Sequence, residues 1–176
     1  VIKCLSGFGC RIIANDVYEN DAVRAYAEYV DLDTLYRESD IITIHTPLLP
    51  ETTGMIDREA IAKMKDGVVF IDNARGELMD IDAVTEAVES GKFGALFMDA
   101  FPGETGIIHV PHDEDIIRTP GMPYFKLKYL RSFVNVYHTP HMAFFTEEAA
   151  EQMAECGVNS IYEILTEGKS KHEIPC

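Results

Sequence analysis

The sequence predicts an α/β domain built around a parallel β-sheet. Short apolar runs rich in β-branched residues alternate along the chain with segments whose apolar residues recur at the period of an α-helix. The apolar runs are nearly uninterrupted, which is typical of strands that are buried on both faces and separated by helices. The length of 176 residues is enough for one domain with a substantial core.

Five strands are expected. The first, RIIAND, follows SGFG, which is typical of the end of a helix. The second, IITIH, is closed by Thr46 and Pro47, and the third, GVVFID, leads into the polar sequence NARG. By residue number, the expected strands are 11–16, 41–45, 67–72, 95–100 and 133–138.

Helices are expected between and after these strands. In the segment 79–91, Ile81, Val84, Ala87 and Val88 share one face, and Asp80 and Gly91 have the residue types of an N-cap and a helix end. The other expected helices are 57–64 and 146–168. The segment 102–131 is rich in Pro, Gly, His and Asp, so we expect it to be irregular, and irregular segments of this length are usually functional or disordered.

The charge of the chain excludes some partners. The formal net charge is −15 and the pI is about 4.6. An acidic surface repels phosphate backbones, so nucleic acids and anionic membranes are poor partners. No apolar run approaches the length of a membrane-spanning helix. A small anionic substrate remains possible, because it responds only to the charges of its own pocket.

The four cysteines, which lie near the two ends of the chain, do not indicate a metal site. None of them forms a CxxC pair, so neither zinc nor a redox motif is favoured. Reduced thiols in a cytoplasmic protein are the simpler interpretation.

Polar residues gather just after the predicted strands. The carboxyl ends of parallel strands lie at one edge of the sheet, where open α/β sheets bind their ligands. We therefore expect the residues after the strands to share this edge. They are Asp16, His45, Thr46, Pro47, Asn73, Ala74, Arg75, Asp99, Glu104, Thr139, Pro140 and His141.

Each of the chemically useful residues at this edge allows two interpretations. Arg75 presents a planar fork of donors that matches a carboxylate, or it forms an ion pair with an acid such as Glu77. His141 is an acid/base or a structural histidine, and Glu104 orients a histidine or is a solvated loop acid. Asp16 accepts hydrogen bonds from an adenosine ribose, or it is a surface or capping residue.

Five stretches in this order resemble the D-isomer-specific 2-hydroxyacid dehydrogenase family, and within it the D-lactate dehydrogenase group. They are GFGCRIIANDVYEN, SDIITIHTPLLPETTGMID, MKDGVVFIDNARGELMD, FMDAFPGETG and TPHMAFFTEEA. The resemblance runs from about Gly7 to Gly168. It implies a doubly wound parallel sheet of the Rossmann type.

The resemblance also implies a role for each site residue. Arg75 binds the substrate carboxylate, His141 exchanges a proton with the substrate oxygen, and Glu104 pairs with His141. Asp16 holds the adenosine ribose, which favours NAD over NADP, and Asp99 lies by the nicotinamide amide. The remaining residues that line the cofactor path are Thr46, Pro47, Thr52, Asn73 and Ala74. The implied reaction is reduction of a 2-keto acid such as pyruvate by NADH, or its reverse.

One family motif is absent from the chain. The family's G-x-G-x-x-G turn after the first strand, which cradles the pyrophosphate, has no match here. The expectation is therefore a partial NAD-binding domain over 1–145, whose first strand, phosphate loop and most of the substrate domain lie upstream. Residues 146–176 are expected to return toward that substrate domain. The resemblance suggests a homodimer, and a non-catalytic NAD-binding scaffold is the alternative function.

Overall fold

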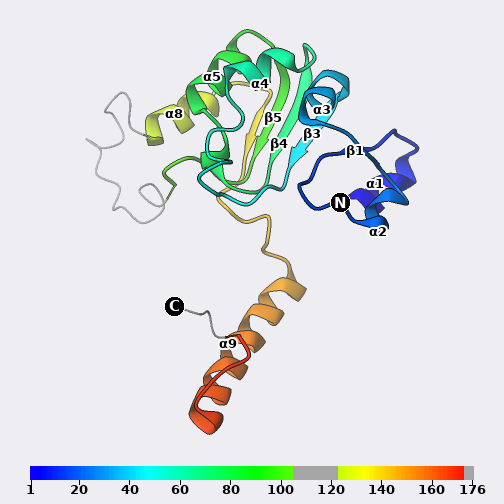
Figure 1. The fold of residues 1–176 in the computed structure, drawn as a ribbon. Helices are drawn as coiled ribbons and strands as arrows, with labels where there is room; N and C mark the ends of the chain where they lie inside the picture. Colours follow the sequence, from blue (N-terminus) through cyan, green and yellow to red (C-terminus); the bar gives the residue numbers. More distant parts are fainter. Residues whose placement is uncertain (105–122, 173–176) are drawn as a thin grey trace. The chain divides into compact units, whose positions relative to one another are not determined.

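The computed structural model describes residues 1–104 and 123–172. The chain divides into two compact units, Val1–Pro140 and His141–Cys176. The first unit contains the β-sheets, and the second contains a long helix (Figure 1).

A four-stranded parallel sheet forms the centre of the first unit and confirms the predicted α/β class. The register brings the last residues of the four strands level, because Ile44 pairs with Asp72, Asp72 with Met98 and Met98 with His138. The loops that follow the strands therefore start from one edge of the sheet. In spatial order the strands are β3 (Ile41–Ile44), β4 (Val68–Asp72), β5 (Phe93–Met98) and β6 (Val136–His138).

Four helices share one apolar core with one face of this sheet. Strand residues such as Ile42, Phe70 and Leu96 are buried in this core. On the strand positions between them, Phe97 and Tyr137 are exposed, and their rings stack with centroids 4.6 Å apart. The four helices are α3 (Leu32–Glu38), α4 (Arg58–Lys63), α5 (Ile81–Glu89) and α8 (Pro123–Leu130).

The ends of α5 are set by the residues that the sequence indicated. The side chain of Asp80 accepts hydrogen bonds from the backbone N–H groups of Asp82 and Ala83, which have no partner inside the helix. After the helix, Gly91 adopts a left-handed conformation (φ 75°) that a residue with a side chain rarely takes. The predicted helix 79–91 is thus confirmed with shorter bounds.

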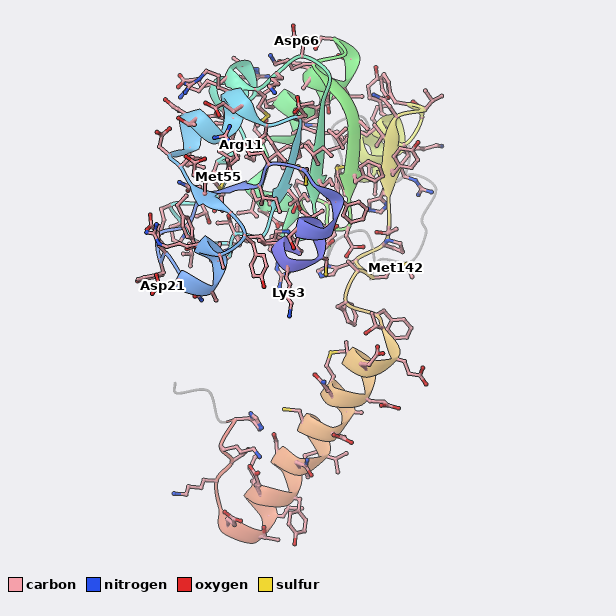
Figure 2. All side chains as sticks on the ribbon, turned by 90° about the vertical axis from the view of Figure 1, so that its right-hand side faces the viewer. Lys3, Arg11, Asp21, Met55, Asp66 and Met142 are labelled. Atoms are coloured by element: carbon pink, nitrogen blue, oxygen red, sulfur yellow. The ribbon has the colours of Figure 1, made fainter. Side chains whose placement is uncertain are left out.

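A second, two-stranded parallel sheet lies near the N-terminus. Its strands, β1 (Ile13–Ala14) and β2 (Glu28–Tyr29), are separate from the four-stranded sheet. The guanidinium of Arg11 bridges Glu28 and Glu38 at 2.9 and 2.6 Å, and so connects this sheet to the end of α3 (Figure 2). The other elements here are α1 (Ile2–Leu5), the 3₁₀ helix η1 (Ser6–Phe8) and α2 (Asp21–Arg24).

The expectation that 102–131 is irregular is wrong at its C-terminal end. Leu127 and Leu130 of α8 are buried in the core. Lys126 forms an ion pair with Asp82 of α5, at 2.6 Å, so α8 lies beside α5 (Figure 1). This helix is stabilised by tertiary packing, which outweighs a local composition that favours irregular chain. Residues 105–122 lie outside the described part.

The second unit contains α9 (Glu147–Glu167), which confirms the helix predicted at 146–168. Thr146 caps its N-terminus by accepting a hydrogen bond from the N–H of Ala149, and Gly168 ends it in a left-handed conformation. Among the described residues, no helix combines the length and the apolar character that crossing a membrane requires.

The packing of α8 predicts a large effect of one truncation. Leu130→Ala removes a fully buried side chain and should lower the free energy of unfolding by about 2–5 kcal/mol. The matched control is Leu165→Ala on α9, where the leucine is 80% exposed and the change should be within about 0.5 kcal/mol. Urea unfolding of the two variants measures both values, and equal small losses would contradict the packing of α8.

Candidate functional site

The loops at the carboxyl edge of the four-stranded sheet are bonded to one another. The segment after β3 pairs with the segment after β4 through Gly54 N–H to the Glu77 carbonyl (2.9 Å) and Ile56 N–H to the Leu78 carbonyl (3.0 Å). The loop after β5 is attached in turn, because the N–H of Gly103 donates to Oε1 of Glu77 at 3.2 Å. Three consecutive loops therefore form one connected surface.

Gly76 brings two of these loops into direct backbone contact. A Cβ on this residue would lie 2.2 Å from the carbonyl carbon of Phe101 and 2.3 Å from the nitrogen of Pro102. Only glycine allows so close an approach. The contact places Arg75, directly before Gly76, on a loop packed against the loop that carries Glu104.

Arg75 is exposed at the end of this loop. Its backbone is extended, and Nη1 donates to the carbonyl of Ala74 at 2.8 Å. The alternative ion pair with Glu77 is not formed, since Glu77 Oε1 accepts from Gly103 instead. Within the described part of the chain no carboxylate is paired with Arg75, so its fork of donors is available for an anion.

Glu104 is half-buried on the loop after β5. Oε2 of its carboxylate accepts a hydrogen bond from the N–H of Phe101 at 3.2 Å, and its own N–H donates to the carbonyl of Phe101 at 3.0 Å. The second bond closes the backbone turn, and the first holds the side chain against it. Glu104 is thus an ordered carboxylate next to the loop of Arg75, rather than a freely solvated one.

Asp99 joins the ends of β4, β5 and β6. Its N–H donates to the carbonyl of Asp72 at 2.9 Å, and its buried carboxylate accepts a short hydrogen bond from the hydroxyl of Thr139. The N–H of Thr139 donates to the carbonyl of Met98 at 3.0 Å. Through these bonds the chain after β6 leaves the sheet beside Asp99.

Asp72, the last residue of β4, was missed as a functional candidate. It is completely buried, and Oδ1 accepts from the N–H of Ala74 at 2.8 Å. Burial raises the pKa of Asp72 to about 6; the N–H groups of Ala74 and Arg75 oppose this shift, and Glu77 and Glu104 add to it. The available signal was a charged residue that ends the otherwise apolar run VVFID.

The turn after β3 holds three predicted cofactor residues. The hydroxyl of Thr52 donates to the carbonyl of Pro47 at 2.7 Å and accepts from the N–H of Leu49 at 2.8 Å. Thr52 therefore closes the turn that carries Thr46 and Pro47. This structural role of Thr52 was not foreseen, and Thr46 is half-buried while Pro47 is exposed.

Two predicted residues lie outside this group of loops. Asp16 is exposed after β1 in the small sheet, and Oδ1 of its carboxylate accepts from the N–H of Tyr18 at 3.0 Å. His141 begins the second unit, where it is half-buried, has a left-handed backbone (φ 50°), and has its ring 6.3 Å from that of Phe144. The pairing of His141 with Glu104 stays a prediction.

The donor set fits a dinucleotide and a small acid. Asp16 Oδ2 is an exposed acceptor suited to ribose hydroxyls, while the loops with Asn73, Ala74 and Asp99 offer amide and carbonyl groups at the sheet edge. The guanidinium of Arg75 beside these loops, which pairs with no acid in the described ranges, matches a carboxylate. The arrangement is chemically consistent with the NAD and 2-keto acid expected from the sequence.

The Gly76 contact yields a stability prediction. Gly76→Ala forces the backbones of two loops apart and should lower the free energy of unfolding by about 2–3 kcal/mol. Gly7→Ala is the control, because its added Cβ would meet nothing within 4 Å. Denaturant titration compares the two, and a Gly76→Ala protein as stable as the control would disprove the close contact.

The buried acid yields a pH prediction. Because the pKa of Asp72 is higher in the folded chain than in the unfolded one, the folded chain holds more protons between about pH 4 and about pH 6, and stability falls as pH rises through this window. Asp72→Asn should remove this loss and stabilise the protein at neutral pH by up to about 3 kcal/mol. Thermal unfolding against pH tests it, and a variant less stable than wild type at neutral pH would refute it.

Known proteins resemble this chain over its whole length. The aromatic 2-oxoacid reductase of Clostridium sporogenes is 40% identical over 177 residues, which cover 100% of this chain and 52% of the relative. The D-lactate dehydrogenase of Leuconostoc mesenteroides subsp. cremoris is 42% identical over 153 residues, covering 86% of this chain and 45% of the relative. The chain thus spans about half the length of these relatives.

A solved structure shows the same fold. The D-lactate dehydrogenase of Lactobacillus jensenii, crystallised with NAD⁺, superposes with a TM-score of 0.86 at 33% identity, over 99% of this chain and 51% of that one. Residues 1–143 match the family described as D-isomer specific 2-hydroxyacid dehydrogenase, NAD binding domain. The expected family and its cofactor type are confirmed, and the chain belongs to the NAD-binding domains of the D-isomer specific 2-hydroxyacid dehydrogenases.

Proposed function

We propose that this chain is the NAD-binding part of an enzyme that reduces a pyruvate-like 2-oxo acid to the D-2-hydroxy acid, and catalyses the reverse reaction. The observation that carries the proposal is Arg75, an exposed guanidinium that no carboxylate of residues 1–104 or 123–172 pairs with, held by the Gly76 contact beside the loop of Glu104. A carboxylate held at this point lies at the edge where the family binds its cofactor.

Each proposed catalytic residue has one task. Arg75 binds the substrate carboxylate through two N–H groups and orients the oxo group. His141 gives a proton to the substrate oxygen as the carbon is reduced, and takes it back in the reverse direction. Glu104 stabilises the charged imidazole and orients it. NADH, when bound, supplies the hydride.

The proposed cofactor residues divide by the part of the dinucleotide they serve. Asp16 accepts hydrogen bonds from the adenosine ribose, which its charge makes selective against a 2′-phosphate. Asp99 lies by the nicotinamide amide. The residues along the path between them are Thr46, Pro47, Thr52, Asn73 and Ala74.

The doubly wound order of the sheet belongs to the same proposal. One further parallel strand, followed by a Gly-rich phosphate loop, would pair with β1 on one side and β3 on the other and unite the two sheets. Each of these strands pairs with one neighbour in the described chain, which supports the idea. The boundary between 1–145 and 146–176, the return of 146–176 toward a substrate domain, and the homodimer remain proposals as well.

The test uses the protein expressed from its complete reading frame. Oxidation of NADH is followed with pyruvate and with an aromatic 2-oxo acid, since similar proteins are named a pyruvate reductase and an aromatic 2-oxoacid reductase. Turnover of either supports the proposal, and the preferred substrate defines the side-chain pocket. Binding of NADH without turnover of any 2-oxo acid would instead favour a non-catalytic scaffold.

Replacing Arg75 gives the sharpest mutational prediction. Arg75→Lys keeps the charge but loses the planar fork, so kcat/KM for the 2-oxo acid should fall about 100-fold, while NADH binding stays within about twofold. Arg37→Lys on the exposed face of α3 is the matched control and should leave both values unchanged. Steady-state kinetics that show no difference between the two variants would exclude this role of Arg75.

A further inference from the structure

The strongest unexplained feature of the first unit is the side chain of Asp72. Its Oδ2 atom is buried and has no hydrogen-bond partner, and no other described residue has a buried side-chain nitrogen or oxygen in this state. We propose that Asp72 is a positioning residue that acts as a neutral acid, so that the loop it holds presents Arg75 to a substrate anion with its positive charge uncompensated. This inference rests on the proposed function of Arg75.

Asp72 controls the path of the chain toward Arg75. It ends β4, level with Ile44 of β3 and Met98 of β5, and its carbonyl accepts from the N–H of Asp99 at 2.9 Å. Oδ1 of its side chain accepts from the N–H of Ala74 at 2.8 Å. The residue before Arg75 is therefore fixed by this carboxyl, on a strand end that cannot move without moving its neighbours.

The two protonation states of this carboxyl are not equally suited to the site. A neutral acid keeps the contact made by Oδ1 and leaves one buried O–H on Oδ2 without an acceptor among the described residues, which costs less than a buried charge. An ionised group would bury a negative charge with one oxygen bare of donors, which is costly in an apolar surrounding. Burial raises the pKa of Asp72 to about 6, in agreement with this geometry.

The charged groups around Asp72 also favour its neutral form. Glu77 and Glu104, on the loops after β4 and β5, both disfavour a charge on Asp72. The carboxylate of Asp99, directly after β5, accepts from the hydroxyl of Thr139. At the ends of the outer strands, His45 after β3 and His138 on β6 each have a pKa lowered first by burial, so neither favours the cationic form that would compensate Asp72.

The guanidinium of Arg75 does not neutralise Asp72 either. Nη1 donates to the carbonyl of Ala74, and the structure records no ion pair between the two side chains in the described residues. A negative charge on Asp72, three residues before Arg75, would weaken the attraction between this guanidinium and a substrate carboxylate. By reciprocity, binding of the anion favours the protonated acid and draws one proton from solvent onto Oδ2.

The experiment measures anion binding and proton uptake together. The full-length protein saturated with NADH is titrated with oxamate, an unreactive analogue of pyruvate, by calorimetry at about pH 5.5 and about pH 8 in buffers of different ionisation enthalpy. Between about pH 5.5 and about pH 8, the oxamate affinity of the wild type should fall about tenfold more than that of Asp72→Asn. Near pH 6.5 the variant should take up about half a proton fewer than the wild type on binding oxamate, which is the uptake that a tenfold coupling gives.

Two further variants isolate the effect. Asp66→Asn removes one negative charge before the start of β4, at the opposite end of the strand, and should behave as wild type (Figure 2). Asp72→Val removes the acceptor for Ala74 as well as the proton, so its oxamate affinity should be low at both pH values. If Asp72→Asn binds oxamate tightly and Asp72→Val does not, the side-chain oxygen that accepts from the N–H of Ala74 is the group that positions Arg75.

The outcomes separate this inference from the proposed function. If Arg75→Met binds oxamate as well as wild type, the proposed function of Arg75 is wrong. If Arg75→Met loses binding while Asp72→Asn keeps the wild-type pH dependence and proton uptake, the inference on Asp72 is wrong. Infrared difference spectra of the wild type need no variant: oxamate binding at about pH 6.5 should produce a protonated-carboxyl band, and its absence would overturn the inference.

Discussion

The close contact between the backbone of Gly76 and that of Phe101 and Pro102 is the constraint on which the site depends. A side chain of any size at Gly76 would separate the loops after β4 and β5. These loops carry Arg75 and Glu104, an exposed guanidinium and an ordered carboxylate. A single position without a Cβ therefore brings together two charged groups that are 29 residues apart by number.

The sheet provides the platform for this contact. The four strands end level, and backbone bonds run from Asp99 to Asp72 and from Thr139 to Met98 across the edge. A parallel sheet concentrates loops at one edge, and those loops are free to carry chemistry because the strands below them are rigid. Asp72 links the sheet to the loop after β4, because its backbone lies in the strand and its carboxyl holds the loop.

Sequence reasoning succeeded where the local pattern carries the physical cause. IITIH and GVVFID form strands as their apolar runs predicted, although burial alternates along them and does not cover both faces in the described chain. Asp80 and Gly91 bound α5 for local reasons of hydrogen bonding and backbone conformation. It failed for α8, whose stability comes from packing against α5. It also assigned nothing to α2 and α3, although Asn20 and Asp31 cap their first turns. The carboxyl edge was predictable, whereas the state of Asp72 depends on burial that no linear pattern displays.

The central claim is that Arg75 receives the carboxylate of a 2-oxo acid at this edge. The most direct measurement is a crystal structure of the full-length protein with NADH and oxamate. The account predicts both oxamate carboxylate oxygens on the guanidinium of Arg75, with the loop of Gly76 still packed on Phe101. A carboxylate bound by other residues, with Arg75 left in solvent or paired to an acid of its own chain, would contradict it.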